Sequence, residues 1–146
     1  MDIVQEALDS LYNESQDNPE AFVSPDRVAA YLMLKHEQEK PLDEQFRVLY
    51  LDNQHRLLAD VVEFTGTVNA ATVHPRRIVR ESLLHNAAAV ILSHNHPSGA
   101  VSPSAADVGL TRRLRDILEV VDVRVLDHII VGSGGKSHSL SQSGDM

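Results

Sequence analysis

The residues whose types and spacing could do chemistry together are gathered in Ser93-His94-Asn95-His96-Pro97-Ser98-Gly99, with Ser104 and Asp107 following shortly after. His94 and His96 alternate at the end of the apolar run 87–92, so both imidazoles leave a strand on one face if the strand continues that far. A loop rich in Pro and Gly then leads to a helix whose first turn carries Asp107. Two imidazoles and one carboxylate make three ligands, the number with which a catalytic zinc site leaves its fourth position for water. The spacing therefore predicts a hydrolytic metal site.

Asp107 has two interpretations. It lies three residues before Leu110 and seven before Leu114, which places it on the helix face that should meet the sheet. A carboxylate at the edge of a core is costly without a partner, and a metal near His94 and His96 would supply one. The alternative is a capping box, with Ser104 as N-cap and Asp107 at the third helical position. The sequence favours the metal, because the His-x-His pair precedes it.

The histidines also have a purely structural interpretation, since most of the eight in this chain are expected to be surface or hydrogen-bonded residues. His128, in Leu126-Asp127-His128-Ile129-Ile130, alternates within an apolar strand. That position favours a buried, hydrogen-bonded structural histidine over a residue that orients a metal ligand. His94 and His96 differ, because a polar pair that ends a buried strand beside a Gly/Pro loop lies where α/β proteins usually place their active sites.

The elements that must position these residues can be read from hydrophobic periodicity. Helical spacing occurs over about residues 3–12, 25–40, 75–86 and 104–120, and strand-like runs occur at 46–51, 57–64, 87–92 and 123–131. Residues 52–55 resemble a hairpin connection, which makes the first two strands antiparallel. Strands that alternate with helices around a hydrophobic central strand predict a single α/β domain with a three-layer mixed sheet flanked by helices.

Composition excludes several classes of protein. With 146 residues and 42% hydrophobic content, one core is expected. The 13 Lys and Arg against 21 Asp and Glu give a net charge of −8, which weighs against a broad electrostatic hold on nucleic acid or on an anionic membrane. There is no cysteine, so thiolate-bound zinc, iron–sulfur clusters and a cysteine nucleophile are excluded. The start of the chain lacks the features of a secretory signal, and no apolar run approaches about 18 residues, which predicts a cytoplasmic protein without a membrane span.

The chain resembles the RadC family, whose domain belongs to the JAB/MPN group of metalloproteins, from about Ser24 to Val131. The JAMM signature of that group is an upstream glutamate, then His-x-His, seven residues, Ser, two residues and Asp, and the spacing from His94 to Asp107 fits it without an insertion. Five short segments also resemble RadC sequences: Phe64-Thr65-Gly66-Thr67, His74-Pro75-Arg76, His94-Asn95-His96-Pro97-Ser98-Gly99, Pro103-Ser104 and Leu126-Asp127-His128. A coincidence across all five segments is not expected.

The resemblance implies a fold, a cofactor and roles for named residues. The fold would be the JAB/MPN fold, which is similar to that of cytidine deaminases. His94, His96 and Asp107 would bind zinc, which can lower the pKa of its water to about 7. Glu44 would act as general base and acid, although Glu63 and Glu81 are also available, and Ser104 would donate to the developing oxyanion. The implied activity is zinc metallopeptidase or isopeptidase hydrolysis of a protein or peptide-tagged substrate.

The resemblance does not extend to every part of the longer RadC-like proteins. These carry an N-terminal helix-hairpin-helix region that grips DNA, whereas here residues 1–23 read as a helix and linker before a RadC-like domain at 24–146, so the chain is expected to be a short form. The apolar segment 3–12 could supply a homodimer contact. Two alternatives to the peptidase stay open. One is a DNA-linked repair or mobile-element accessory protein, a nuclease included, and the other is a non-catalytic JAB-fold interaction module. A zinc deaminase is excluded, because it requires Pro-Cys-x-x-Cys.

Overall fold

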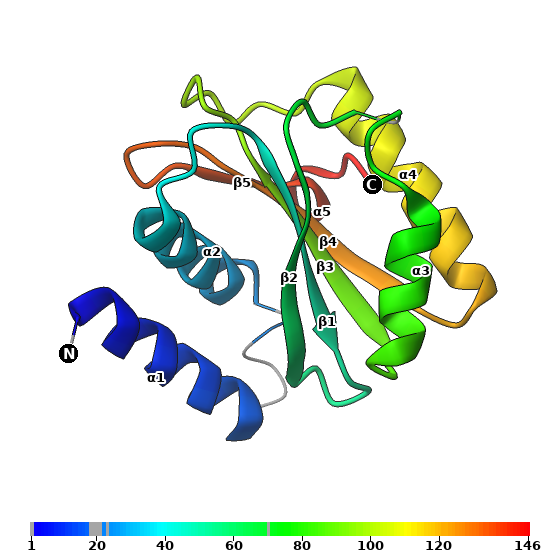
Figure 1. Cartoon of the computed structure of the whole chain (residues 1–146), viewed down its shortest axis with the longest axis horizontal. Coiled ribbons are helices and arrows are strands. Elements are labelled where there is room, and N and C mark those ends of the chain that lie inside the picture. The colour runs from blue at the N-terminus through cyan, green and yellow to red at the C-terminus, as the bar shows by residue number, and fades with distance from the viewer. Residues whose placement is uncertain (1, 18–21, 23, 70) are drawn as a thin grey trace.

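The computed structural model describes residues 2–17, 22, 24–69 and 71–146, and its secondary structure alternates between helices and strands (Figure 1). The helices are α1 (Ile3–Asp17), α2 (Pro25–Glu39), α3 (Pro75–Leu84), α4 (Ala105–Val120) and α5 (Leu140–Ser143). The strands are β1 (Gln45–Leu51), β2 (Leu57–Thr65), β3 (Ala89–Asn95), β4 (Arg124–Val131) and β5 (Ser137–Ser139). No helix of the described residues is both long enough and apolar enough to cross a membrane.

The five strands form one mixed sheet in the order β2-β1-β3-β4-β5. β1 pairs antiparallel with β2 and with β3, β4 pairs antiparallel with β5, and only β3 and β4 run parallel. The parallel pair follows from the chain between them, because a crossover through a helix such as α4 returns the second strand in the direction of the first. β3 is central, and its entire length is buried.

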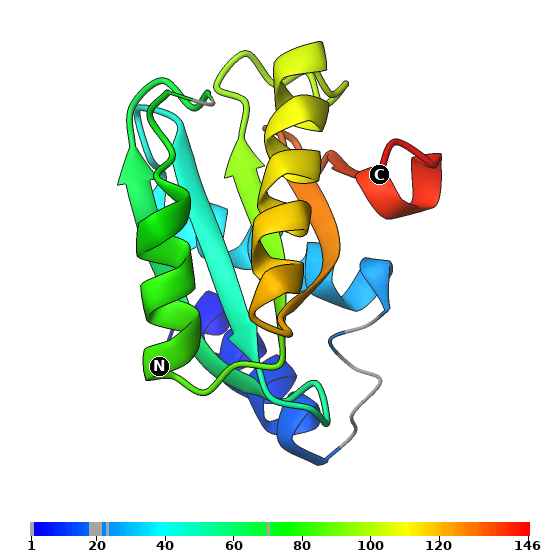
Figure 2. The same ribbon diagram turned by 90° about the vertical axis from the view of Figure 1, so that its right-hand side faces the viewer.

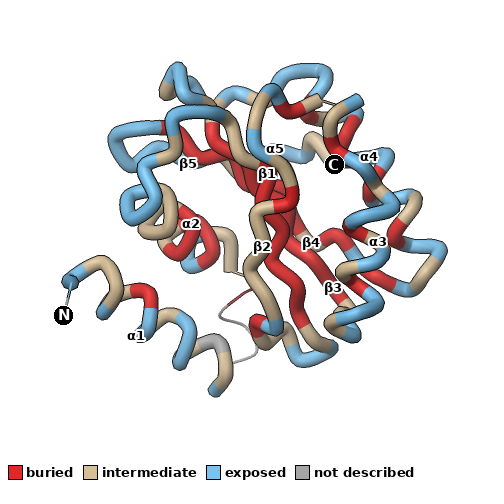
Figure 3. Tube along the Cα trace, viewed as in Figure 1, coloured by how far each residue is buried: buried red, intermediate tan, exposed pale blue. Residues whose placement is uncertain are grey.

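Helices cover both faces of this sheet, so the protein has three layers (Figure 1). On one face, residues of α1 and α2 pack with Leu49, Ile91 and Ile129 in one apolar cluster. On the other face, residues of α3 and α4 pack with Val48 and Leu92 in a second cluster. Buried residues follow the strands and the inner sides of the helices (Figure 3). The predicted three-layer α/β domain with a mixed sheet is confirmed.

The N-terminal helix is longer than the sequence suggested. Polar residues from Asn13 onward were expected to end it, yet α1 continues to Asp17. Leu8 is only 4% exposed, and Val4 and Leu11 pack beside it on the cluster that includes α2. The apolar stripe of α1 is therefore used within the chain, and the homodimer contact stays a prediction. The predicted boundary at residues 23 and 24 adjoins residues 18–21 and 23, which lie outside the described residues.

One end of the sheet collects the ends of several elements. β3 ends there, and α4 begins beside it after a short loop (Figure 2). β1 starts at this same end, because it runs antiparallel to β3 and Phe46 pairs with His94. Residues that are far apart in the sequence are thereby brought together at the carboxyl end of the central strand.

Candidate metal centre

The two histidines of the His-x-His motif meet at the end of β3. The strand continues past the apolar run through Asn95, so His94 belongs to it, and His96 follows directly. The His96 N–H donates to Val131 O at 2.9 Å, which extends the pairing with β4 by one residue. As a result, His94 Nε2 and His96 Nε2 lie 2.8 Å apart. His94 is 2% exposed, whereas His96 is partly open to solvent.

Asp107 faces both histidines from the first turn of α4. Its Oδ1 lies 3.2 Å from His94 Nε2, and its Oδ2 lies 3.4 Å from His96 Nε2. The predicted capping box is formed as well, because Ser104 Oγ accepts from Asp107 N and Asp107 Oδ2 accepts from Ser104 N. Burial raises the pKa of Asp107, but hydrogen bonds from His94 and from the Ser104 N–H outweigh burial, and the net pKa is lowered. The group is therefore a carboxylate at neutral pH.

The three side chains fit a zinc ion. Each offers one ligand atom, and these atoms lie within 4.8 Å of one another. In a tetrahedral site with bonds of about 2.0–2.1 Å, nitrogen and oxygen ligands stand about 3.3 Å apart. The Asp107 oxygens lie 3.2 Å and 3.4 Å from the two histidine nitrogens, which is close to that value, and the 2.8 Å between the two nitrogens is shorter. The donor set, two imidazoles and a carboxylate, also leaves a coordination position for water.

His96 is held by the loop that follows it. Its Nδ1 lies 2.8 Å from Ala100 O, and a carbonyl can only accept, so the ring donates from Nδ1 and turns Nε2 toward His94. The loop in turn packs on the turn after β4. A Cβ added at Gly132 would lie 2.5 Å from Gly99 O, so Gly132 permits an approach that another residue would block.

His94 is held from behind by His128, on the neighbouring strand β4. Their contact joins His94 Nδ1 and His128 Nε2 at 2.7 Å, and the other nitrogen of His128 lies 2.6 Å from Thr111 Oγ1. Burial lowers the pKa of His128, and the nearby His94 lowers it further. The predicted buried, hydrogen-bonded histidine is thus observed, and its partner is one of the predicted ligands.

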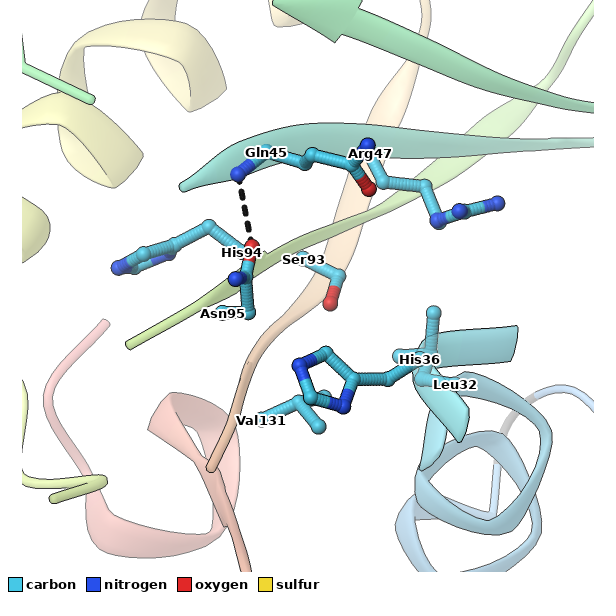
Figure 4. Close-up of a pocket in the computed structure, with 8 residues that line it drawn as sticks. All are labelled: Leu32, His36, Gln45, Arg47, Ser93, His94, Asn95 and Val131. Carbon is cyan, nitrogen blue, oxygen red and sulfur yellow. Dashed lines mark hydrogen bonds between the residues drawn. The ribbon is translucent and has the colours of Figure 1, made fainter. Parts of the chain in front are cut away.

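Glu44 lies at the same end of the sheet, one residue before β1 begins. Its Oε2 accepts from Val68 N at 3.0 Å, and its carbonyl accepts from Gly66 N at 2.8 Å. The side chain of Asn95 reaches the residues on either side of it. Asn95 Oδ1 accepts from Gln45 N at 2.7 Å, as Figure 4 shows, and Nδ2 donates to Asp43 O at 3.2 Å. The residue between the two histidines therefore fixes the segment that carries Glu44.

The two other glutamates considered from the sequence have different partners. Glu63 is buried, accepts from the Tyr50 hydroxyl at 2.6 Å and pairs with Arg77 at 2.7 Å. Burial raises the pKa of Glu63, and the bonds from Tyr50 and Arg77 oppose that rise. Glu81, on α3, places its Oε2 3.3 Å from Nε2 of His85, the residue directly after the helix. Like Glu44, neither belongs to the group formed by His94, His96 and Asp107.

Sequence reasoning missed two residues of this site. Thr111 had a usable signal, because it follows Asp107 by four residues and so shares its helix face. Asn95 had none, since its partners Asp43 and Gln45 are about fifty residues away and are reached only through the pairing of β1 with β3.

Comparison with known sequences gives one family. A family profile described as RadC-like JAB domain matches residues 22–145. The UPF0758 protein YkfG of Escherichia coli is 47% identical over 142 residues, which cover 97% of this chain and 88% of that protein.

Longer relatives match in the same way. A UPF0758 protein of Vibrio cholerae is 50% identical over 123 residues, which cover 83% of this chain and 53% of that protein. Another, of Vibrio parahaemolyticus, is 47% identical over 133 residues, covering 90% of this chain and 57% of that protein. The chain spans about half the length of these two relatives.

Proposed function

Because the chain belongs to the RadC-like JAB domain family, we propose that it is a zinc-dependent hydrolase, a peptidase or isopeptidase of the JAMM type. The observation that carries the proposal is the convergence of His94 Nε2, His96 Nε2 and the Asp107 carboxylate on one point. The proposed substrate is a protein or a peptide-tagged molecule with a scissile amide bond.

The proposed ligands are His94, His96 and Asp107. All three offer nitrogen or oxygen donors, and the absence of cysteine in the sequence removes thiolates from consideration. Zinc would supply Lewis acidity here, which lowers the pKa of a coordinated water to about 7.

Glu44 is the proposed general base and acid. Its Oε2 already accepts from Val68 N, which leaves Oε1 to take a proton from the attacking water. As the water oxygen bonds to the carbonyl carbon and the C–N bond breaks, the same carboxyl returns that proton to the leaving amine. The lack of a direct contact between Glu44 and the ligands is compatible with this role, because hydrogen bonds of catalytic groups tighten when substrate binds.

Ser104 is the proposed oxyanion donor. Its Oγ accepts from Asp107 N in the capping box, so its own hydroxyl hydrogen is not needed for the cap. The residue is exposed at the start of α4, where a substrate carbonyl can reach it. A donor in that position stabilises the negative charge of the tetrahedral intermediate, and the loss of one such donor costs about 100-fold or more in turnover.

The first test is the zinc content of untagged protein purified without chelator, measured by elemental mass spectrometry. We expect near-stoichiometric zinc in the wild type and loss of zinc in His96→Ala and Asp107→Ala. Leu83→Ala is the control, because Leu83 is 60% exposed on α3 and lies outside the site. A folded, metal-free wild type would overturn the hydrolase and favour a non-catalytic interaction module.

The second test separates metal binding from catalysis. Glu44→Gln removes the proton acceptor but keeps the carbonyl oxygen that can accept from Val68 N. We expect this variant to keep its zinc and to lose hydrolysis of peptide and isopeptide substrates by about 100-fold or more. Zinc retention with unchanged hydrolysis would show that Glu44 is not the base.

A further inference from the structure

A chain of hydrogen bonds runs behind His94 and returns to the first turn of α4. His94 Nδ1 contacts His128 Nε2 at 2.7 Å, His128 Nδ1 contacts Thr111 Oγ1 at 2.6 Å, and Thr111 Oγ1 donates to Asp107 O at 2.8 Å. The chain thus begins at one proposed ligand and ends on the backbone of another. Thr111 and His128 are both 0% exposed, so water does not compete for these bonds.

The hydrogens in this chain can be counted. A carbonyl can only accept, so the single hydroxyl hydrogen of Thr111 goes to Asp107 O. The contact between Thr111 Oγ1 and His128 then needs a hydrogen from the imidazole, which places a proton on His128 Nδ1. Thr111 therefore determines which nitrogen of His128 carries the proton.

The same count extends to His94. A second proton on His128 would create a fully buried cation whose ring has no hydrogen-bonded carboxylate among the described residues, which is unfavourable. A neutral His128 with its proton on Nδ1 presents a lone pair at Nε2. The contact at 2.7 Å must then be a donation from His94 Nδ1, which leaves Nε2 of His94 to face Asp107 and His96.

We propose that Thr111 and His128 are positioning residues that hold a proton on His94 Nδ1 and orient the ring, so that its Nε2 faces His96 and Asp107. This inference rests on the proposed function, because it assigns these two residues to the proposed zinc site. Phe46 supports the arrangement sterically, since its ring meets the His128 ring edge to face at a centroid distance of 5.8 Å. His96 reaches the same tautomer through a backbone carbonyl, whereas His94 depends on side chains that can be substituted.

The matched variants are Thr111→Val and Thr111→Ser. Valine has nearly the same shape but no hydroxyl, so His128 loses the acceptor that holds its proton on Nδ1. The His128 proton can then move to Nε2 and donate to His94 Nδ1, which forces the proton of His94 onto the ligand atom. Serine keeps the hydroxyl and with it the tautomer. Partners of metal-binding histidines typically contribute about 10–100-fold to metal affinity, and we expect a loss of that size in Thr111→Val only.

The first readout is the tautomer itself, observed without metal. Long-range proton–nitrogen NMR spectra of histidine-labelled, metal-free protein distinguish a ring protonated at Nδ1 from one protonated at Nε2. We expect a proton on His94 Nδ1 in the wild type and in Thr111→Ser, and its loss from Nδ1 in Thr111→Val. A wild-type His94 without a proton on Nδ1 would overturn the inference, and this spectrum decides the matter even if the valine variant does not fold.

The second readout is zinc affinity, measured by competition with a chromophoric chelator. Weaker binding in Thr111→Val with near wild-type binding in Thr111→Ser supports the inference. Equal affinities in all three folded proteins overturn it and leave the proposed hydrolase intact. A wild type that binds no zinc, yet shows the expected tautomer, overturns the proposed function instead.

Discussion

At the scale of single residues, Asp107 shows why two interpretations of one side chain need not compete. The sequence presented a helix cap and a metal ligand as alternatives, yet a carboxylate has two oxygens and several lone pairs. One oxygen accepts the Ser104 N–H while both face histidine nitrogens. The capping box orients the Asp107 carboxylate toward the histidines. The same carboxylate also stabilises the first turn of α4.

Asn95 gives a prediction at this scale. Asn95→Ala removes the two hydrogen bonds that Asn95 makes to Gln45 N and Asp43 O, both of which are partly buried. We expect it to lower the free energy of unfolding by about 1–3 kcal/mol, measured by urea denaturation, and to leave zinc content unchanged.

The matched control for Asn95 is Ser93, two residues earlier on the same face of β3, where its side chain lies near His36 of α2 (Figure 4). Ser93→Ala is expected to cost less than about 1 kcal/mol, because it removes one small hydroxyl without a hydrogen bond to residues 43–45. Equal losses of unfolding free energy in the two variants would contradict the role of Asn95 in fixing the segment that carries Glu44.

At the scale of elements, the sequence predicted local structure better than pairing. Hydrophobic periodicity located α2 to α4 and β1 to β4 to within a few residues, because each of these elements has its own apolar face. It ended α1 too early and missed the short β5 and α5. It did not predict that β3 continues through Asn95. His94 and Asn95 are polar, and their burial is possible because their side chains form hydrogen bonds with residues that are distant in the sequence.

The order of the strands in the sheet could not be predicted from the sequence either. Nothing local places β1 between β2 and β3, and that placement brings Glu44 to the end of the sheet that carries the candidate site. The proposed ligands could be grouped from the sequence because they lie within one short stretch, whereas their supporting residues come from β1, β4 and α4.

The close approach of two loops yields an element-scale prediction. Gly132→Ala places a methyl group 2.5 Å from Gly99 O and 2.8 Å from Val101 Cγ1, so the loop after His96 must move. We expect a loss of about 1–3 kcal/mol in unfolding free energy, together with weaker zinc binding.

Gly109→Ala is the opposite case. Gly109 lies within α4, where an added Cβ meets nothing within 4 Å, so alanine should stabilise the protein by about 0.5–1 kcal/mol. Urea denaturation of both variants measures the difference, and a neutral Gly132→Ala would show that the loop adapts freely.

At the scale of the whole molecule, the sheet separates two apolar clusters, and the rings of His94 and His128 lie on the face that carries α3 and α4. His128 meets Phe46, a member of the cluster with α3 and α4, while α1 and α2 close the other face. The stability of the site therefore depends on α1 only through the cooperativity of the whole fold.

That cooperativity can be measured at α1. Leu8→Ala creates a cavity in the cluster shared with α2, and we expect a loss of about 2–4 kcal/mol in unfolding free energy. Ile3→Ala, at a side chain that is 81% exposed, should change it by less than about 0.5 kcal/mol. Circular dichroism and tyrosine fluorescence should give one coincident transition in both variants. Separate transitions would show that α1 folds apart from the rest.

The placement of the three proposed ligands on different kinds of backbone has a kinetic consequence. His94 is anchored on a strand whose neighbours pair with it on both sides, so its amide should exchange with solvent only when the whole protein unfolds. Asp107 begins a helix at the end of a surface loop, where local opening is cheaper. A bound ion would then escape by way of the first turn of α4, and its residence time would be set by fraying of one helix end rather than by global unfolding.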